Sequence, residues 1–150
     1  MSETSDLIKL YSARILALTA EIPHLGRLEA PQASVRKRSP LCGSTVTVDL
    51  DMAGGLVSRF GQEVKACALG QAAAAVLGGA VLGRSAAELE AAAAQLEAML
   101  KHDGPVPEAP FDGFEALLPA REFRNRHTSI LLAVQAAAEA ARQAETAQTA

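Results

Sequence analysis

A run of 18 residues without a charged side chain, residues 66–83, limits most strongly what this chain can fold into. Gln71 is its only strongly polar residue, and Lys65 and Arg84 stand at its two ends. Such a run either crosses a membrane or forms a helix inside a protein core. Alanine and glycine dominate it, and alanine contributes little apolar area per residue. The run therefore predicts a buried helix over residues 68–82.

A pattern typical of a β-hairpin precedes this helix. Residues 44–52 alternate in character and are rich in β-branched side chains, which favours a strand. Gly54 and Gly55 supply a turn, and residues 55–64 are expected to return as the second strand. Residues 33–38 are a candidate edge strand. We therefore expect a small, mostly antiparallel, three-stranded sheet.

Helical patterns flank the sheet on both sides along the chain. Apolar residues recur at helical spacing in residues 5–22, and Pro23 ends that segment. Ser85 and Glu88 form a capping box, which predicts a helix from there to about Lys101.

The C-terminal third is expected to be a loop followed by two more helices. Residues 103–110 contain three prolines and one glycine, which predicts a loop. Residues 111–118 are expected to form a short helix before Pro119. Residues 126–143 are expected to form the last helix, with residues 143–150 as a frayed tail. The element order predicts a single α+β domain over all 150 residues, with helices packed on one face of the sheet.

Charge and cysteine content restrict the class of protein. The formal net charge is −3, so we expect no strong attraction to nucleic acid or to an anionic membrane. Residues 1–6 are acidic and resemble neither a secretory signal nor a transit peptide, which predicts a cytoplasmic protein. In that compartment its two cysteines are expected to be reduced.

Both cysteines fall at expected element boundaries. Cys42 lies in a Pro-Leu-Cys-Gly turn directly before a strand, and Gly43 lets the backbone bend there. Cys67 falls where the hairpin gives way to the uncharged helix. The free N–H groups and the dipole at a helix start favour the thiolate form of a cysteine. Taken singly, each cysteine could equally be a partly buried, inert thiol.

His127 opens the last predicted helix beside Arg124 and Arg126. The neighbouring arginines favour the neutral imidazole, which is the form that binds metals. A surface or helix-capping histidine is the alternative interpretation. A nucleophilic enzyme that pairs a cysteine with His127 would need an orienting Asn or Asp and an oxyanion loop, and neither is evident. We therefore expect a protein that is not an enzyme.

Residues 35–38 (Val-Arg-Lys-Arg) are basic. On an edge strand, such charges usually keep other strands from pairing with it, and no aromatic residues are interleaved to stack on nucleic-acid bases. Docking of an acidic partner remains an alternative use of this stretch.

Together these features resemble the IscU, SufU and NifU N-terminal proteins. Pro-X-Cys-Gly around Cys42 precedes the hairpin, and Cys67 opens a helix of small residues. Residues 83–85 (Gly-Arg-Ser) stand where that family carries Gly-Lys/Arg-Ser before a capped helix. Residues 127–131 (His-Thr-Ser-Ile-Leu) are similar to the family's His-Cys-Ser-Ile-Leu. The resemblance covers about residues 8–143.

The resemblance implies a 2Fe–2S cluster or zinc held by three cysteines with help from an Asp or His. By position, Cys42, Cys67 and His127 are the implied ligands. Ser44 replaces the family's Asp, and Thr128 replaces the third cysteine, which in the family receives persulfide sulfur. Ser44 and Thr128 are therefore only weaker candidate ligands. Two thiolates and an imidazole suit zinc or an iron–sulfur fragment, and argue against magnesium and calcium.

We thus expect an iron–sulfur cluster assembly scaffold-like protein that binds zinc, iron or a cluster and passes it on. The alternative is a degenerate paralogue that binds no metal and acts as an interaction module. The resemblance implies a cysteine desulfurase and iron–sulfur acceptor proteins as partners. We expect a monomer or weak homo-oligomer, without nucleic-acid or membrane partners. Geometrically, the three implied ligands are expected to converge at one end of the sheet, about 3–5 Å apart.

Overall fold

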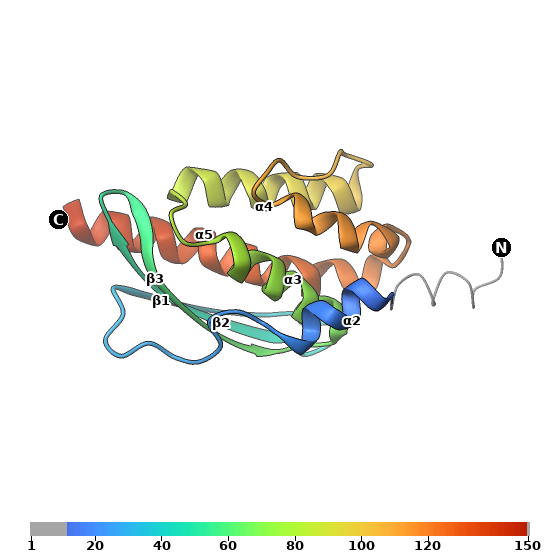
Figure 1. The fold of residues 1–150 in the computed structure, drawn as a ribbon, viewed down its shortest axis with the longest axis horizontal. Coiled ribbons are helices and arrows are strands. Elements are labelled where there is room, and N and C mark those ends of the chain that lie inside the picture. The colour runs from blue at the N-terminus through green and yellow to red at the C-terminus, as the bar shows by residue number, and fades with distance from the viewer. Residues whose placement is uncertain (1–11, 150) are drawn as a thin grey trace.

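A short helix, three strands and a series of helices follow one another along residues 12–149, the part of the chain that the computed structural model describes (Figure 1). The α-helices and strands are α2 (Ala13–Ala20), β1 (Ala33–Arg38), β2 (Thr45–Ala53), β3 (Leu56–Lys65), α3 (Ala68–Ala80), α4 (Ala86–Lys101) and α5 (His127–Thr149). Two 3-10 helices, η1 (Asp112–Glu122) and η2 (Arg124–Arg126), lie between α4 and α5.

The sheet has the predicted antiparallel order β1-β2-β3. Gly54 and Gly55 connect β2 to β3 with φ angles of 60° and 79°. These left-handed conformations are what a two-residue type I′ hairpin turn requires, and glycine adopts them without steric cost. β1 pairs with β2 so that Ala33 lies opposite Leu50.

One face of the sheet contributes to the hydrophobic core, and the opposite face does not. Val46, Val48 and Leu50 of β2 are fully buried and join the hydrophobic core. Because side chains alternate along a strand, Thr47 and Asp49 point to the opposite face. Figure 1 shows α3, α4 and α5 together on one side of the sheet. The predicted α+β architecture, with helices on one face, is therefore confirmed.

The uncharged run forms α3, which is part of the layers of helices that cover the sheet. α5 packs on β1 and β2, and both α3 and α4 pack against α5. α3 comes close enough to α5 that a Cβ at Gly70 would lie 2.7 Å from the Ser129 hydroxyl. Leu69, Ala72 and Leu77 of α3 are at most 1% exposed, as expected of a core helix. Within residues 12–149, no helix combines the length and the apolar character needed to cross a membrane.

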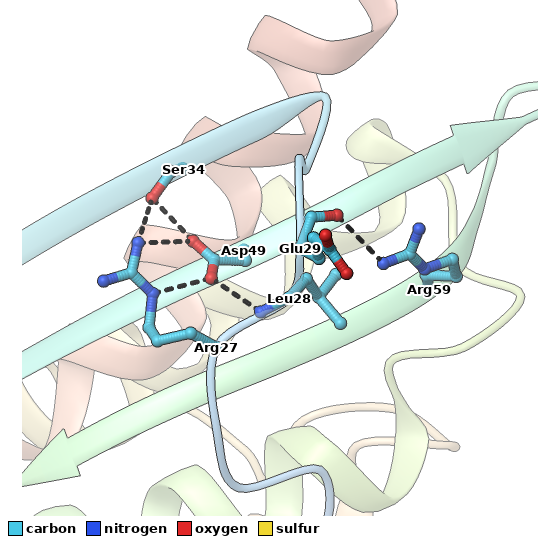
Figure 2. Close-up of polar contacts among 6 residues, drawn as sticks. All are labelled: Arg27, Leu28, Glu29, Ser34, Asp49 and Arg59. Atoms are coloured by element: carbon cyan, nitrogen blue, oxygen red, sulfur yellow. Dashed lines mark hydrogen bonds and ion pairs between the residues drawn. The ribbon is translucent and has the colours of Figure 1, made fainter.

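A buried carboxylate holds the segment between α2 and β1 across the face that the helices leave open (Figures 1 and 2). Asp49 accepts hydrogen bonds from Arg27 Nε (2.7 Å), the Ser34 hydroxyl (2.6 Å) and the Leu28 amide (3.0 Å). Burial raises the pKa of Asp49, but these hydrogen bonds and the Arg27 charge outweigh burial and keep it below its usual value. No pattern in the sequence predicted this ion pair.

The expected N-terminal helix and last helix both differ in length from the structure. α2 begins at Ala13, with Ser12 as N-cap, and the remainder of the prediction over residues 5–22 falls partly outside the described residues. α5 continues to Thr149, so the predicted end of the last helix near residue 143 is wrong. No Gly or Pro interrupts residues 143–149, and Ala144 is buried.

The segment around Pro119 is also longer than predicted. Pro119 lies inside η1, where it had been expected to end a short helix over residues 111–118. Proline lacks an N–H, but its fixed φ suits the 3-10 conformation, so successive 3-10 turns can pass through it. The capping box at Ser85 and Glu88 is formed as predicted.

Candidate functional site

Cys42 sits at the tip of a closed loop between β1 and β2. The Ser39 amide donates to the Ser44 carbonyl (2.8 Å), and the Gly43 amide donates to the Ser39 carbonyl (2.9 Å). Gly43 has φ 73°, a conformation that favours glycine. Cys42 is exposed, and the neighbouring Leu41 is 71% exposed. The loop therefore presents a thiol and an apolar side chain to a partner.

Buried hydroxyl groups lie directly beneath this thiol. Cys42 Sγ lies 3.3 Å from Ser39 Oγ and 3.1 Å from Ser44 Oγ, and both serines are buried. Hydrogen bonding to Ser39, and then to Ser44, lowers the pKa of the Cys42 thiol to about 7, although partial burial acts in the opposite direction. A large share of this thiol is therefore ionised near neutral pH, and the thiolate is the form that binds metals.

Cys67 is connected to the same loop through Ser129. Cys67 is the N-cap of α3, and its side chain makes no capping hydrogen bond. Ser129, on the first turn of α5, donates to Ser44 Oγ (2.9 Å) and lies 3.6 Å from Cys67 Sγ. We call Cys42, Ser44, Cys67 and Ser129 the thiol cluster. It joins the β1–β2 loop to the starts of α3 and α5 through hydroxyl groups.

Ser129 and Ser39 are the members of this site that sequence reasoning missed. Both lie inside stretches already singled out, but a serine is not distinguished as a site residue by type alone. Their function depends on burial at a junction between elements, since each is at most 1% exposed. Only the tertiary structure reveals that burial.

His127 does not join the thiol cluster. It is 3% exposed, and its Nε2 lies 2.9 Å from the Ala120 carbonyl of η1. A carbonyl only accepts hydrogen bonds, so Nε2 must carry the proton and cannot bind a metal there. The ring lines a cavity of about 520 Å³ with Arg121 and Arg124 among its walls.

The predicted convergence of all three ligands is not found in the described residues. Across residues 12–149, no three His, Cys, Asp or Glu side chains lie close enough together to hold a metal ion. The physical reason is that η1 supplies the hydrogen-bond partner for the His127 ring. Thr128 is half-buried beside His127, and Ser44 lies within the thiol cluster as a hydroxyl.

Comparison with known proteins gives matches among solved structures. No protein-family model matches the chain, and no curated protein matches it. It is similar to a crystal structure of a nitrogen-fixing NifU-like protein (N-terminal) from Brucella abortus, with 42% identity, a TM-score of 0.91, and coverage of 94% of this chain and 98% of that one.

Two more distant structures share the fold. One, from the thermophile Fervidobacterium islandicum AW-1, is assigned as an iron–sulfur cluster assembly scaffold of the SUF system, with 19% identity, a TM-score of 0.78, and coverage of 89% of this chain and 98% of that one. The other is a hypothetical protein with 22% identity, a TM-score of 0.76, and coverage of 90% of this chain and 98% of that one.

Proposed function

The chain belongs to the NifU/IscU/SufU-type family, and we propose that it is a non-enzymatic scaffold that binds zinc, iron or a 2Fe–2S cluster as cargo and passes it on. The observation that supports the proposal is the thiol cluster, in which the hydroxyls of Ser44 and Ser129 link Cys42 to Cys67. The family relation alone would leave open whether this divergent chain keeps a usable site.

The donor set of the thiol cluster fits such cargo. Two thiolates are soft ligands, which zinc and iron–sulfur clusters favour over magnesium or calcium. Cys42 supplies a thiol whose pKa is already lowered to about 7. The hydroxyls of Ser44 and Ser129 are weak ligands, and their role is to stabilise and orient the sulfur atoms. Cargo bound by two sulfurs keeps coordination positions free for a donor or an acceptor, which suits transfer.

His127 is proposed as a ligand that binds only after a local rearrangement. Its Nε2 donates to the Ala120 carbonyl, and the ring lies outside the thiol cluster in the observed conformation. Recruitment of the ring would require η1 to shift or the His127 side chain to turn. The two cysteines are therefore the primary ligands, and His127 is the secondary one.

The partners that we propose are a cytoplasmic cysteine desulfurase and iron–sulfur acceptor proteins. The exposed Leu41–Cys42 tip gives such proteins direct access to one of the two sulfurs. Thr128 has no sulfur, so any persulfide delivered to this chain must be received by Cys42 or Cys67.

A second candidate function is a metal-free interaction module within iron–sulfur biogenesis. It is favoured by Ser44 and Thr128, which place hydroxyls at two of the positions where the family carries better ligands. Under this alternative, the buried serines would stabilise the loop and the thiols would bind nothing.

Elemental analysis of protein purified without oxygen, together with its visible spectrum, separates the two candidates. The scaffold function predicts zinc or iron close to one equivalent per chain, or the absorption of a cluster after reconstitution with ferrous iron and sulfide. The interaction module predicts neither under the same handling. A Cys42→Ser, Cys67→Ser double variant serves as the metal-free control.

A further inference from the structure

The face of the sheet that carries no helices has a groove of about 290 Å³. Its lining residues are Arg27, Ser34, Arg36, Thr45, Thr47, Glu63 and Lys65. Three of these are cations and one is an acid, although the whole chain has a formal net charge of −3. Because Asp49 is paired with Arg27, the excess positive charge of the groove comes from Arg36 and Lys65, which outnumber Glu63.

One wall of the groove is a guanidinium held in a fixed position. Arg27 Nε and Nη2 donate to Asp49, and Nη2 also donates to Ser34 (Figure 2). Figure 2 shows the third nitrogen of Arg27 turned away from the carboxylate. The hydrogen bond and charge of Asp49 raise the pKa of Arg27, so its charge is permanent. An incoming anion would meet a donor that is already oriented.

The other two cations stand on opposite outer strands. Arg36 of β1 lies across from Thr47, and Lys65 of β3 lies across from Thr45, so the central strand separates them. Both are exposed, and no carboxylate within residues 12–149 forms an ion pair with either. Lys37, which points to the helix side, is by contrast paired with Glu139.

The separation between Arg36 and Lys65 favours an acidic polypeptide over a small anion. Strands two apart in a sheet are about 10 Å apart, which is more than a single carboxylate or phosphate spans. An acidic polypeptide presents several carboxylates at comparable intervals. Among the described residues that line the groove none is aromatic, so it lacks the stacking surfaces typical of single-stranded nucleic-acid sites. Glu63 within the groove would also repel a continuous phosphate backbone.

We propose that this groove docks an acidic segment of a protein partner, whose carboxylates pair with Arg27, Arg36 and Lys65. Thr45 and Thr47 form a low floor that lets an extended segment lie across the strands. The inference is separate from the proposed cargo function, because neither cysteine lines the groove. It would hold equally for a metal-free interaction module.

The test uses a fluorescent oligoglutamate peptide and the full-length chain. Binding followed by anisotropy is expected to weaken as salt is added, since exposed charges are screened. Arg36→Gln combined with Lys65→Gln is expected to weaken binding about tenfold. Glu63→Gln is expected to strengthen it, because a like charge leaves the groove. A loss of folding would weaken binding, so stronger binding by Glu63→Gln cannot be explained by misfolding.

The matched control is Arg14→Gln with Lys101→Gln, which removes two exposed cations elsewhere and gives the same net charge. It is expected to change binding by less than about twofold. The proposal is overturned if this control weakens binding as much as the groove pair does. It is also overturned if inorganic phosphate or a single-stranded oligonucleotide displaces the peptide at lower concentration than unlabelled oligoglutamate.

Discussion

Two residues at the start of α5, His127 and Ser129, are close in sequence but face different parts of the protein. Ser129 points to the cysteines and completes the thiol cluster, whereas His127 points to η1 and binds the Ala120 carbonyl. In an α-helix, residues two apart lie on nearly opposite sides. Once Ser129 faces the cysteines, His127 must therefore turn away from them. A sequence motif can keep its order while a helix divides its members between two sites.

The largest expected contrast between these regions is in metal affinity. Cys42→Ser and Cys67→Ser are each expected to weaken zinc binding more than about 100-fold, because each removes a thiolate ligand. His127→Ala is expected to weaken it at most about tenfold, since the ring is engaged elsewhere. Competition titration against a chromophoric chelator measures all three affinities.

The same histidine variant should instead affect folding. His127→Ala leaves the buried Ala120 carbonyl without its partner, at a cost of about 1–3 kcal/mol in the free energy of unfolding. Urea titration of the metal-free protein checks this. If His127→Ala lowers zinc affinity as much as the cysteine variants do, the separation of the two regions is wrong.

The second prediction concerns a cysteine introduced between His127 and Ser129. Thr128 follows His127 and precedes Ser129, so a cysteine there is next to both. Thr128→Cys with Ser44→Asp is expected to raise the yield of reconstituted cluster about tenfold, because a third sulfur and a carboxylate join the donor set. Visible absorption after reconstitution compares wild type, both single variants and the double. Equal assembly by wild type would show that the two thiols already suffice.

The position of the predicted elements and of both cysteines could be derived from the sequence. The Gly54–Gly55 turn and the Ser85 cap depend on local backbone chemistry, which is why they are formed as predicted. The helix predicted to begin at residue 68 does begin at Ala68, with Cys67 as its N-cap. A helix start is thus readable from sequence to within about one residue here.

The direction in which His127 points could not be derived in the same way. Helix geometry requires His127 and Ser129 to diverge, but it does not say which of them faces the cysteines. That depends on η1, whose 3-10 turns through Pro119 bring the Ala120 carbonyl to the ring. The buried Asp49 was likewise hidden, because an acidic residue in an alternating strand normally faces solvent.

The third prediction concerns the effect of Ser39 and Ser44 on the pKa of Cys42. Ser44→Ala or Ser39→Ala should raise the pKa of Cys42 above about 7 by removing a hydrogen bond to its sulfur. At pH 7, alkylation of Cys42 by iodoacetamide is then expected to slow about threefold to tenfold. Mass spectrometry in a Cys67→Ala background follows Cys42 alone. A rate profile that keeps its midpoint near pH 7 would mean that the serines do not tune the thiol.

The smallest expected effect is that of metal removal on stability. The apolar faces of the sheet and helices form one core, so folding does not depend on the cargo. A chelator is expected to lower the Tm by no more than about 4 °C, equivalent to about 1–2 kcal/mol. Differential scanning calorimetry with and without chelator measures this. Unfolding upon chelation would show a structural metal.

X-ray absorption at the zinc edge of the zinc-loaded protein tests the central claim most directly, because it counts the sulfur atoms around the metal. The thiol cluster predicts two sulfur neighbours at about 2.3 Å, with nitrogen or oxygen completing the set. Loss of one sulfur in Cys67→Ser would assign the second ligand. A first shell of nitrogen and oxygen alone would contradict the claim that Cys42 and Cys67 hold the cargo together.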